Sequence, residues 1–254
     1  YVLHAEHPRY VEEGECSDIE ELNRMRPPIA ELMGIREAIK LAKCGLSVHI
    51  THVSTRVGLE EILKAKHAGI RITCDVTPHH LIFFKEGVKR DSPLFLVLPP
   101  IRDRSDRDYL ISALKSGVID AVCSDHAPHT LEEKKVSPTD AFGIQSLQYL
   151  LPLIYSLCRK IGIDFRRILD LMTINPAQIF GIRRRGKIKV GNYADIVVFD
   201  PRRKWVIDPD NCYSKARYSP YDGMLVRGEV VATFLRGSLV YEHGIFLRRI
   251  GKHI

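Results

Sequence analysis

The sequence has little of what marks a membrane or secreted protein. It contains no apolar run long enough to cross a bilayer, and its N-terminal residues do not form a signal peptide. Its six cysteines, at positions 16, 44, 74, 123, 158 and 212, show no paired spacing. Because Cys74 and Cys123 lie inside strand-like apolar runs, we expect reduced cysteines in the core of a cytoplasmic protein with no membrane partner.

Acidic residues are fewer than basic ones, 31 against 38, which gives a formal net charge of +7. Such a charge can indicate a nucleic-acid partner. Here, however, the basic residues are scattered apart from Arg183-Arg184-Arg185 and Arg248-Arg249, and aromatic residues do not alternate with them. We therefore expect a solvated basic surface and no nucleic acid, and such a surface also suits a heat-adapted protein.

The chain is long enough for one large core and a small second domain, since 45% of its 254 residues are hydrophobic. Helix-like stretches alternate with strand-like runs, the latter at 1–6, 47–54, 70–76 and 119–123. The helices are expected at 29–39, 58–68, 105–114 (with Ser105 as a cap), 144–160 and 164–174. This alternation predicts a parallel sheet with right-handed crossovers. Four such strands make up half of an eight-stranded α/β barrel of the TIM type.

The pattern changes after about Gly181. Glycine turns then separate short strand-like runs at 186–191, 194–200, 228–235 and 238–241. This favours a small antiparallel sheet beside the barrel. We therefore expect two domains, a barrel half at residues 1–181 and a small, β-sandwich-like domain at residues 182–254.

The stretch from Ala121 to Thr130 carries the strongest sign of chemistry. A buried strand is expected to end there at Ser124-Asp125, and His126 and His129 follow within a short loop. An α/β barrel places its catalytic groups at the C-terminal ends of its strands, and Asp and His are common ligands and bases. The alternative is a polar loop that caps the next helix.

Two histidines occupy the same kind of position. His4 ends the first strand-like run and His52 the second, so both are expected to meet Asp125 in the mouth of a barrel. Two imidazoles and a carboxylate are part of what a catalytic zinc site needs, namely three protein ligands and an open position for water. His49 competes with His52 but lies deeper in the strand and on its other face. The alternative for each is an ordinary strand histidine. Two further histidines are expected to support the site rather than to bind metal, His79 and His80.

Several motifs follow one another along almost the whole chain. They are His-Ala-Glu at 4–6, His-Val-Ser at 52–54, Thr-Pro-His-His-Leu at 77–81, Pro-Pro-Ile-Arg at 99–102, Ser-Asp-His-Ala-Pro-His at 124–129, Asn-Pro-Ala at 175–177, Gly-Asn-Tyr-Ala-Asp at 191–195 and Ser-Pro-Tyr-Asp-Gly at 219–223. In these motifs the sequence resembles the type I dihydroorotases of the amidohydrolase superfamily. The Asp-His-Ala-Pro-His run is specific within that superfamily, because related hydantoinases and allantoinases usually vary there.

The resemblance implies a role for each residue of the site. His4 and His52 would bind zinc from the fifth and sixth barrel strands, and Asp125, on the eighth, would be both a ligand and the general acid/base. His129 would bind the carboxylate of the substrate. Phe142-Gly143, after a flexible loop at 131–141, would contact the pyrimidine ring through backbone groups. The implied reaction is the reversible hydrolysis of (S)-dihydroorotate to N-carbamoyl-L-aspartate in pyrimidine biosynthesis, with one or two zinc ions as cofactor.

Two features depart from the family pattern. The family's His-x-His pair, the carboxylate or carboxylated lysine of its fourth strand and its substrate-binding Arg have no counterpart here. Because the chain opens in a strand at Tyr1-Val2-Leu3, we expect that an N-terminal barrel half is missing. We expect the piece alone to be inactive and to associate or aggregate. Leu98 stands where the family usually has an Asn that contacts the substrate, and leucine cannot make the hydrogen bonds of an amide.

These departures keep two other functions open. A hydantoinase- or allantoinase-like cyclic amidase would accommodate Leu98. A non-catalytic dihydroorotase-like subunit could instead bind aspartate transcarbamoylase, although this chain keeps every ligand that its length allows. The partners left open by the resemblance are a small-molecule substrate, a second copy in a homodimer, and aspartate transcarbamoylase.

Overall fold

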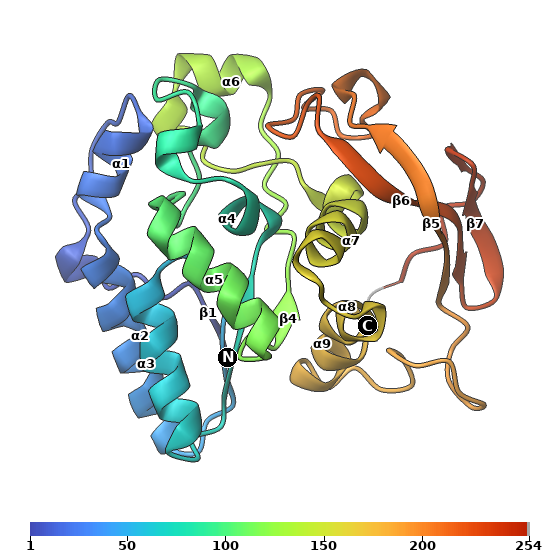
Figure 1. Ribbon diagram of the computed structural model, residues 1–254, viewed down its shortest axis with the longest axis horizontal. Coiled ribbons are helices and arrows are strands. Elements are labelled where there is room, and N and C mark those ends of the chain that lie inside the picture. Colours follow the sequence, from blue (N-terminus) through green and yellow to red (C-terminus); the bar gives the residue numbers. More distant parts are fainter. Residues whose placement is uncertain (253–254) are drawn as a thin grey trace. The chain divides into compact units, whose positions relative to one another are not determined.

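The computed structural model describes residues 1–252 (Figure 1). They form two compact units. The first comprises Tyr1–Leu150 and Asp208–Asp222, and the second comprises Leu151–Ile207 and the residues from Gly223 onward. The second unit joins the helices after residue 151 to the antiparallel sheet. The expected division into a barrel half at residues 1–181 and a small β domain at residues 182–254 stays a prediction.

The first unit is built on a four-stranded parallel sheet in the order β1-β2-β3-β4. The strands are β1 (Val2–Leu3), β2 (Val48–Ile50), β3 (Ile72–Val76) and β4 (Ala121–Val122). Their parallel pairing confirms the α/β class and the four expected strands. Each strand is shorter than its apolar run suggested. The polar residues that follow the strands are no longer paired in the sheet, and they include the expected site residues.

Helices connect the strands and cover the sheet. They are α1 (Ile19–Met25), α2 (Pro28–Lys43), α3 (Arg56–His67), α4 (Pro78–Ile82), α5 (Arg104–Ser116) and α6 (Leu131–Val136). In Figure 1, α2 and α3 lie side by side, and α3 also packs against α5. Their fully buried Ile35, Ile62 and Leu110 form the core with sheet residues such as Ile50 and Val76. Burial of these apolar side chains is the main force that holds the helices on the sheet.

Local signals explain most of the helix ends. Thr55 begins α3, since its side chain accepts a hydrogen bond from the Gly58 amide. The expectation that Ser105 caps α5 is wrong, because Asp103 occupies the N-cap position and Ser105 lies inside the helix. The helix ends at Gly117, whose φ of 86° is in the left-handed region that glycine adopts without strain. Short 3-10 turns complete the unit at Pro8–Tyr10, Lys85–Gly87, Pro93–Phe95, Pro138–Asp140, Leu147–Tyr149 and Pro209–Asn211.

The second unit contains three helices and an antiparallel sheet. The helices are α7 (Leu150–Ile161), α8 (Phe165–Met172) and α9 (Ile174–Ile179). The sheet has the order β5-β6-β7-β8, with β5 (Ile196–Val206), β6 (Leu225–Leu235), β7 (Ser238–Glu242) and β8 (Ile245–Phe246). A separate antiparallel sheet was expected here, although β8 was not.

Two expectations about this part of the chain are wrong. Residues 186–191 form turns rather than a strand, and Ile188 and Val190 are 89% and 99% exposed. No strand within residues 1–252 pairs with them, and a strand needs a partner to satisfy its backbone. The helix expected from Ile144 begins only at Leu150, since Ile144 forms a β-bridge with His126.

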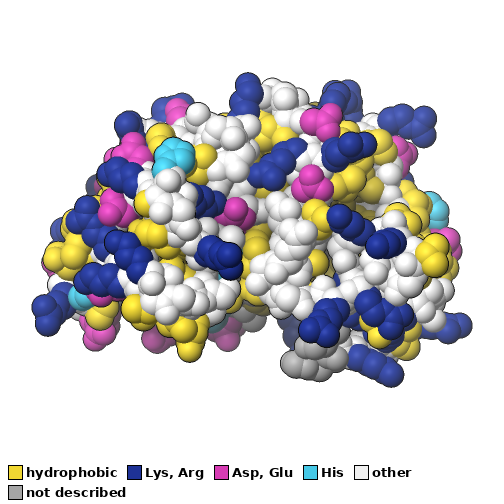
Figure 2. All heavy atoms as spheres, turned by 90° about the horizontal axis from the view of Figure 1, so that it is seen from below, with side chains coloured by type: hydrophobic (Ala, Val, Ile, Leu, Met, Phe, Trp, Pro, Cys, Tyr) yellow, Lys and Arg dark blue, Asp and Glu magenta, His cyan; other side chains and the backbone are white. Residues whose placement is uncertain are grey.

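Basic side chains on the surface are interspersed with side chains of other kinds. On the face shown in Figure 2, lysine and arginine side chains are spread among acidic and apolar ones. A hollow of about 840 Å³ on the second unit is lined by several basic residues, namely Arg183, Arg184, Arg185, Arg236 and Lys252. None of the helices formed by residues 1–252 has the length and apolar character needed to cross a membrane.

Candidate active site

The strand ends of the first unit bring His4 and His52 together, as the sequence predicted. His4 follows β1 and His52 lies two residues beyond β2, at the same edge of the parallel sheet. Nδ1 of His4 is 3.3 Å from Nε2 of His52, and the two rings meet edge to face with centroids 4.9 Å apart. The chain therefore places two imidazole nitrogens at one point, although 48 positions separate them.

Glu6 determines which nitrogen of His4 carries the proton. Its Oε2 lies 2.8 Å from Nε2 of His4 and accepts a 2.6 Å hydrogen bond from Arg26. Burial disfavours the charged carboxylate, but the hydrogen bond from His4 and the charge of Arg26 hold the pKa of Glu6 below its ordinary value. An ionised Glu6 accepts the Nε2 proton, so the lone pair of Nδ1 points toward His52.

The two histidines fit two of the ligand positions around a zinc ion. Burial and the charge of His4 lower the pKa of His52 to about 4, which keeps its imidazole neutral and able to act as a ligand. Two ligand atoms about 2.05 Å from a tetrahedral zinc ion lie about 3.3 Å apart, the separation found here between His4 and His52. Within residues 1–252, however, no group of three or more His, Cys, Asp or Glu side chains is placed to hold a metal ion. Asp125 does not form such a group with the pair, so the ligand roles of all three residues stay predictions.

A buried carboxylate on β3, Asp75, supports the second histidine. It accepts a 2.6 Å hydrogen bond from the backbone amide of His52 and a 2.9 Å bond from the thiol of Cys123. It also lies 3.2 Å from the hydroxyl of Thr51 and 2.8 Å from Nε2 of His49. His49 is thus engaged inside the sheet, whereas His52 faces His4. The sequence does not identify Asp75 as a site residue. The only feature that could have indicated it is a single Asp within an apolar strand.

The backbone is strained at two of the expected site residues. His52 has a φ of 42° and Asp125 a φ of 44°, and neither is glycine. Such left-handed conformations are uncommon for residues with a side chain and gather at functional sites.

Asp125 sits in a partly buried, polar environment. Desolvation and the charge of Asp75 raise the pKa of its carboxyl group, while the nearby His4 opposes the shift. Its Oδ2 is 4.0 Å from Nε2 of His79. A carboxyl group with a raised pKa exchanges a proton more readily near neutrality, which suits a general acid/base.

His79 is a buried histidine close to Asp125. It is completely buried, and neither of its ring nitrogens has a hydrogen-bond partner in the described part of the chain. Burial and the neighbouring His80 hold its pKa well below the ordinary value. His80, by contrast, is satisfied by the Thr77 hydroxyl and the Pro99 carbonyl, at 2.8 and 3.1 Å. An unpaired buried imidazole near Asp125 is a candidate functional group rather than a structural one.

The loop after Asp125 is fastened to the segment that follows α6. Nδ1 of His126 accepts hydrogen bonds from the amides of Ser146 and Leu147, and the Ala127 amide donates to Ile144. A Cβ on Gly143 would lie 2.4 Å from the carbonyl oxygen of Ala127. The close approach of the two segments therefore requires glycine at this position.

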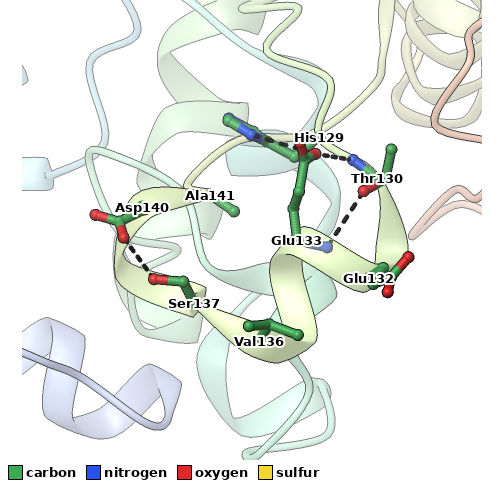
Figure 3. A pocket seen from close by; sticks show the side chains of 8 residues that line it. All are labelled: His129, Thr130, Glu132, Glu133, Val136, Ser137, Asp140 and Ala141. Carbon is green, nitrogen blue, oxygen red and sulfur yellow. Dashed lines mark hydrogen bonds and ion pairs between the residues drawn. The ribbon is translucent and has the colours of Figure 1, made fainter.

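The expected substrate-binding residues lie around α6. Nδ1 of His129 is 4.0 Å from Glu133, and both line a hollow of about 630 Å³ on this helix (Figure 3). The Gly143 amide donates to the Leu96 carbonyl at 3.1 Å, so that the groups left for a ligand at Phe142-Gly143 do not include this donor. The loop expected at 131–141 contains the helix α6, whose capping box of Thr130 and Glu133 gives it a defined start.

Comparison with known proteins decides the family. The amidohydrolase family model matches residues 4–240. The chain belongs to the amidohydrolase family. The match runs through the strand ends that carry His4, His52 and Asp125 and on into the antiparallel sheet.

Curated relatives of this amidohydrolase include dihydroorotases. It is 38% identical over 232 residues to the dihydroorotase of Aquifex aeolicus, covering 91% of this chain and 55% of the relative. It is 42% identical over 230 residues to the dihydroorotase of Pyrococcus horikoshii, covering 89% and 53%. The chain thus spans about half the length of the curated relatives it matches.

Solved structures similar to this amidohydrolase include hydantoinases. The L-hydantoinase (dihydropyrimidinase) of Arthrobacter aurescens matches with a TM-score of 0.89 and 29% identity, over 97% of this chain and 58% of the other. The dihydropyrimidinase of Brevibacillus agri matches with a TM-score of 0.85 and 26% identity, over 97% and 57%. The fold of the chain is therefore that of the corresponding part of these enzymes.

Proposed function

We propose that this chain contributes the fifth to eighth strands of a closed amidohydrolase barrel, and that the full-length protein is a zinc-dependent dihydroorotase. It would convert (S)-dihydroorotate and water reversibly to N-carbamoyl-L-aspartate in pyrimidine biosynthesis. The observation that carries the proposal is the 3.3 Å approach of His4 Nδ1 to His52 Nε2, with Glu6 fixing the His4 proton on the far nitrogen. The remaining metal ligands would come from protein outside these 254 residues.

The residues of the site share the work of this reaction, and Asp125 would serve both as a third zinc ligand beside His4 and His52 and as the general acid/base. His4 and His52 would hold zinc, which when bound supplies Lewis acidity to the scissile carbonyl and to water. Asp125 takes a proton from the attacking water and delivers it to the ring nitrogen, while the new C–O bond forms and the amide C–N bond breaks. His129 donates a hydrogen bond to the carboxylate of the substrate.

A related cyclic amidase is the second candidate, because Leu98 offers no hydrogen bond where a dihydroorotase is expected to have an amide. A hydantoinase- or allantoinase-like enzyme would use the same ligands and the same acid/base on another ring. Hydantoinases are among the solved structures that share the fold of this chain, which supports this alternative function. Homodimerisation, binding to aspartate transcarbamoylase and a cytoplasmic location stay predictions, the last supported by six free thiols.

The test is a turnover assay of the full-length protein with zinc. Dihydroorotate should yield carbamoyl-aspartate, Asp125→Ala should abolish the reaction, and a chelator should abolish it reversibly. Asp108→Asn on the exposed side of α5 is the matched control and should retain activity. Hydrolysis of hydantoin or allantoin without turnover of dihydroorotate would favour the second candidate. Unchanged turnover in Asp125→Ala would remove Asp125 from the mechanism.

A further inference from the structure

The helix α6 is attached to the rest of the first unit in an unusual way. Leu131 and Val136, its two largest apolar residues, are 36% and 79% exposed. The one buried residue of the helix is Lys134, whose side chain is completely inaccessible to solvent. A short helix normally attaches through an apolar face. Here the attachment depends on a buried lysine.

The ammonium group of Lys134 is bound by backbone oxygens. Its Nζ donates to the carbonyls of Pro93 at 3.1 Å, Leu96 at 3.3 Å and Ala141 at 2.8 Å. These three bonds match the three protons of an ammonium group. Within residues 1–252, all three of its hydrogen bonds go to carbonyl oxygens and none goes to a carboxylate. Burial lowers the pKa of Lys134 to about 8, which is consistent with an ammonium that only dipoles stabilise.

The three carbonyls belong to two segments of the chain that lead to residues expected at the substrate site. Pro93 begins the 3-10 turn Pro93–Phe95 and Leu96 follows it, two residues before Leu98, while Ala141 directly precedes Phe142-Gly143. The Leu96 carbonyl also accepts the amide of Gly143, so one oxygen joins Lys134 to the backbone expected to contact the substrate ring.

The expected carboxylate-binding residue, His129, directly precedes the N-cap of α6 at Thr130. Glu133, next to Lys134, accepts from the Thr130 amide at 2.6 Å and lies 4.0 Å from His129 (Figure 3). The position of His129 is therefore linked through the first turn of α6 to the anchor at Lys134. A displacement of the helix would move His129 and release Ala141 together.

We propose that Lys134 is a positioning residue that fixes His129 and Phe142-Gly143 relative to each other by anchoring α6 to the carbonyls of Pro93, Leu96 and Ala141. It does not touch the reacting atoms. Its consequence for catalysis rests on the function proposed above, whereas its consequence for the order of the segment does not.

The test compares Lys134→Met with Lys135→Met in the full-length protein. Methionine keeps the length of the buried side chain but removes all three donors, while Lys135 is an exposed neighbour on the same helix. Amide hydrogen exchange across residues 131–143 should become at least about tenfold faster in Lys134→Met and stay unchanged in Lys135→Met. With dihydroorotate, KM should rise about tenfold while kcat changes less, because binding geometry rather than the acid/base is affected.

Two outcomes would overturn the proposal, namely unchanged exchange in Lys134→Met or a kcat loss with an unaltered KM. If the wild-type protein does not turn over dihydroorotate, the proposed function fails but the exchange experiment still decides the role of Lys134. Should Lys134→Met not fold, exchange in the wild type replaces it. The amides of Lys134 and Gly143 should then open with similar protection, and independent opening would contradict a shared anchor.

Discussion

A glycine in the middle of α2 gives the sharpest test of how the first strand is positioned. A Cβ at Gly34 would lie 2.3 Å from the carbonyl oxygen of Ala5, 2.5 Å from its carbonyl carbon and 3.1 Å from the Glu6 amide. All three atoms are backbone, so no side-chain rotation can relieve the contact. Because an ordinary carbon contact begins near 3.4 Å, Gly34→Ala should force α2 and the residues after β1 apart by roughly 1 Å.

The cost can be estimated from two opposing effects. Alanine is favoured over glycine inside a helix by about 1 kcal/mol. Overpacking a close contact costs about 1–3 kcal/mol, and a backbone clash belongs at the upper end. The net result should be a loss of about 1–2 kcal/mol in the free energy of unfolding. Since Ala5 and Glu6 directly follow His4, a 1 Å shift of this segment should also reduce activity by about 10²-fold.

Urea denaturation and turnover of the full-length protein measure the two effects. Gly251→Ala is the control, because a Cβ there meets nothing within 4 Å. It should leave both the midpoint of unfolding and the activity unchanged. A Gly34→Ala protein as stable and as active as the wild type would refute the close packing of α2 against the end of β1.

Three further predictions concern side chains of the first unit. Glu6→Gln removes the charge that faces His4 and Arg26, and zinc affinity in a chelator competition should fall about 10–100-fold; an unchanged affinity would show that Glu6 does not orient His4. The pKa of the buried His80 is lowered to about 3, so the unfolded state takes up its proton first as the pH falls below 6.5. Stability should therefore drop by about 2 kcal/mol between pH 7 and pH 5 in urea titrations, and this part of the pH dependence should be absent in His80→Asn. Thr130→Val removes the side chain that accepts from the Glu133 amide at 3.2 Å, and should destabilise α6 by about 1 kcal/mol, seen as faster amide exchange confined to that helix.

The arrangement of strands and the meeting of His4 with His52 could be predicted from the sequence. Apolar runs that alternate with amphipathic stretches predict a parallel sheet. A polar residue at the end of each run predicts that the active site lies at the C-terminal ends of the strands. The convergence of His4 and His52 follows from this rule alone, whereas the precise contact with Glu6 depends on side-chain geometry.

The supporting residues could not be predicted in the same way. Asp75 and Lys134 are charged residues in the sequence, and charged residues are normally exposed, so nothing in their type indicated burial. Most of their partners, such as His52 and Cys123 for Asp75 or Pro93 and Leu96 for Lys134, lie far away along the chain, and only the folded structure brings them near. The strand expected at 186–191 failed for the related reason that a strand depends on a partner that its own sequence does not reveal.

The left-handed backbone at His52 and Asp125 has a consequence for how variants of this protein should be judged. A left-handed residue other than glycine costs about 1–2 kcal/mol, so the two positions proposed to bear the chemistry are also places where the fold gives up stability. Glycine at either position would relax the chain and delete the working side chain in one step. A variant selected only for resistance to heat could therefore drift toward an inert protein, and screens on this enzyme family member should score turnover alongside melting.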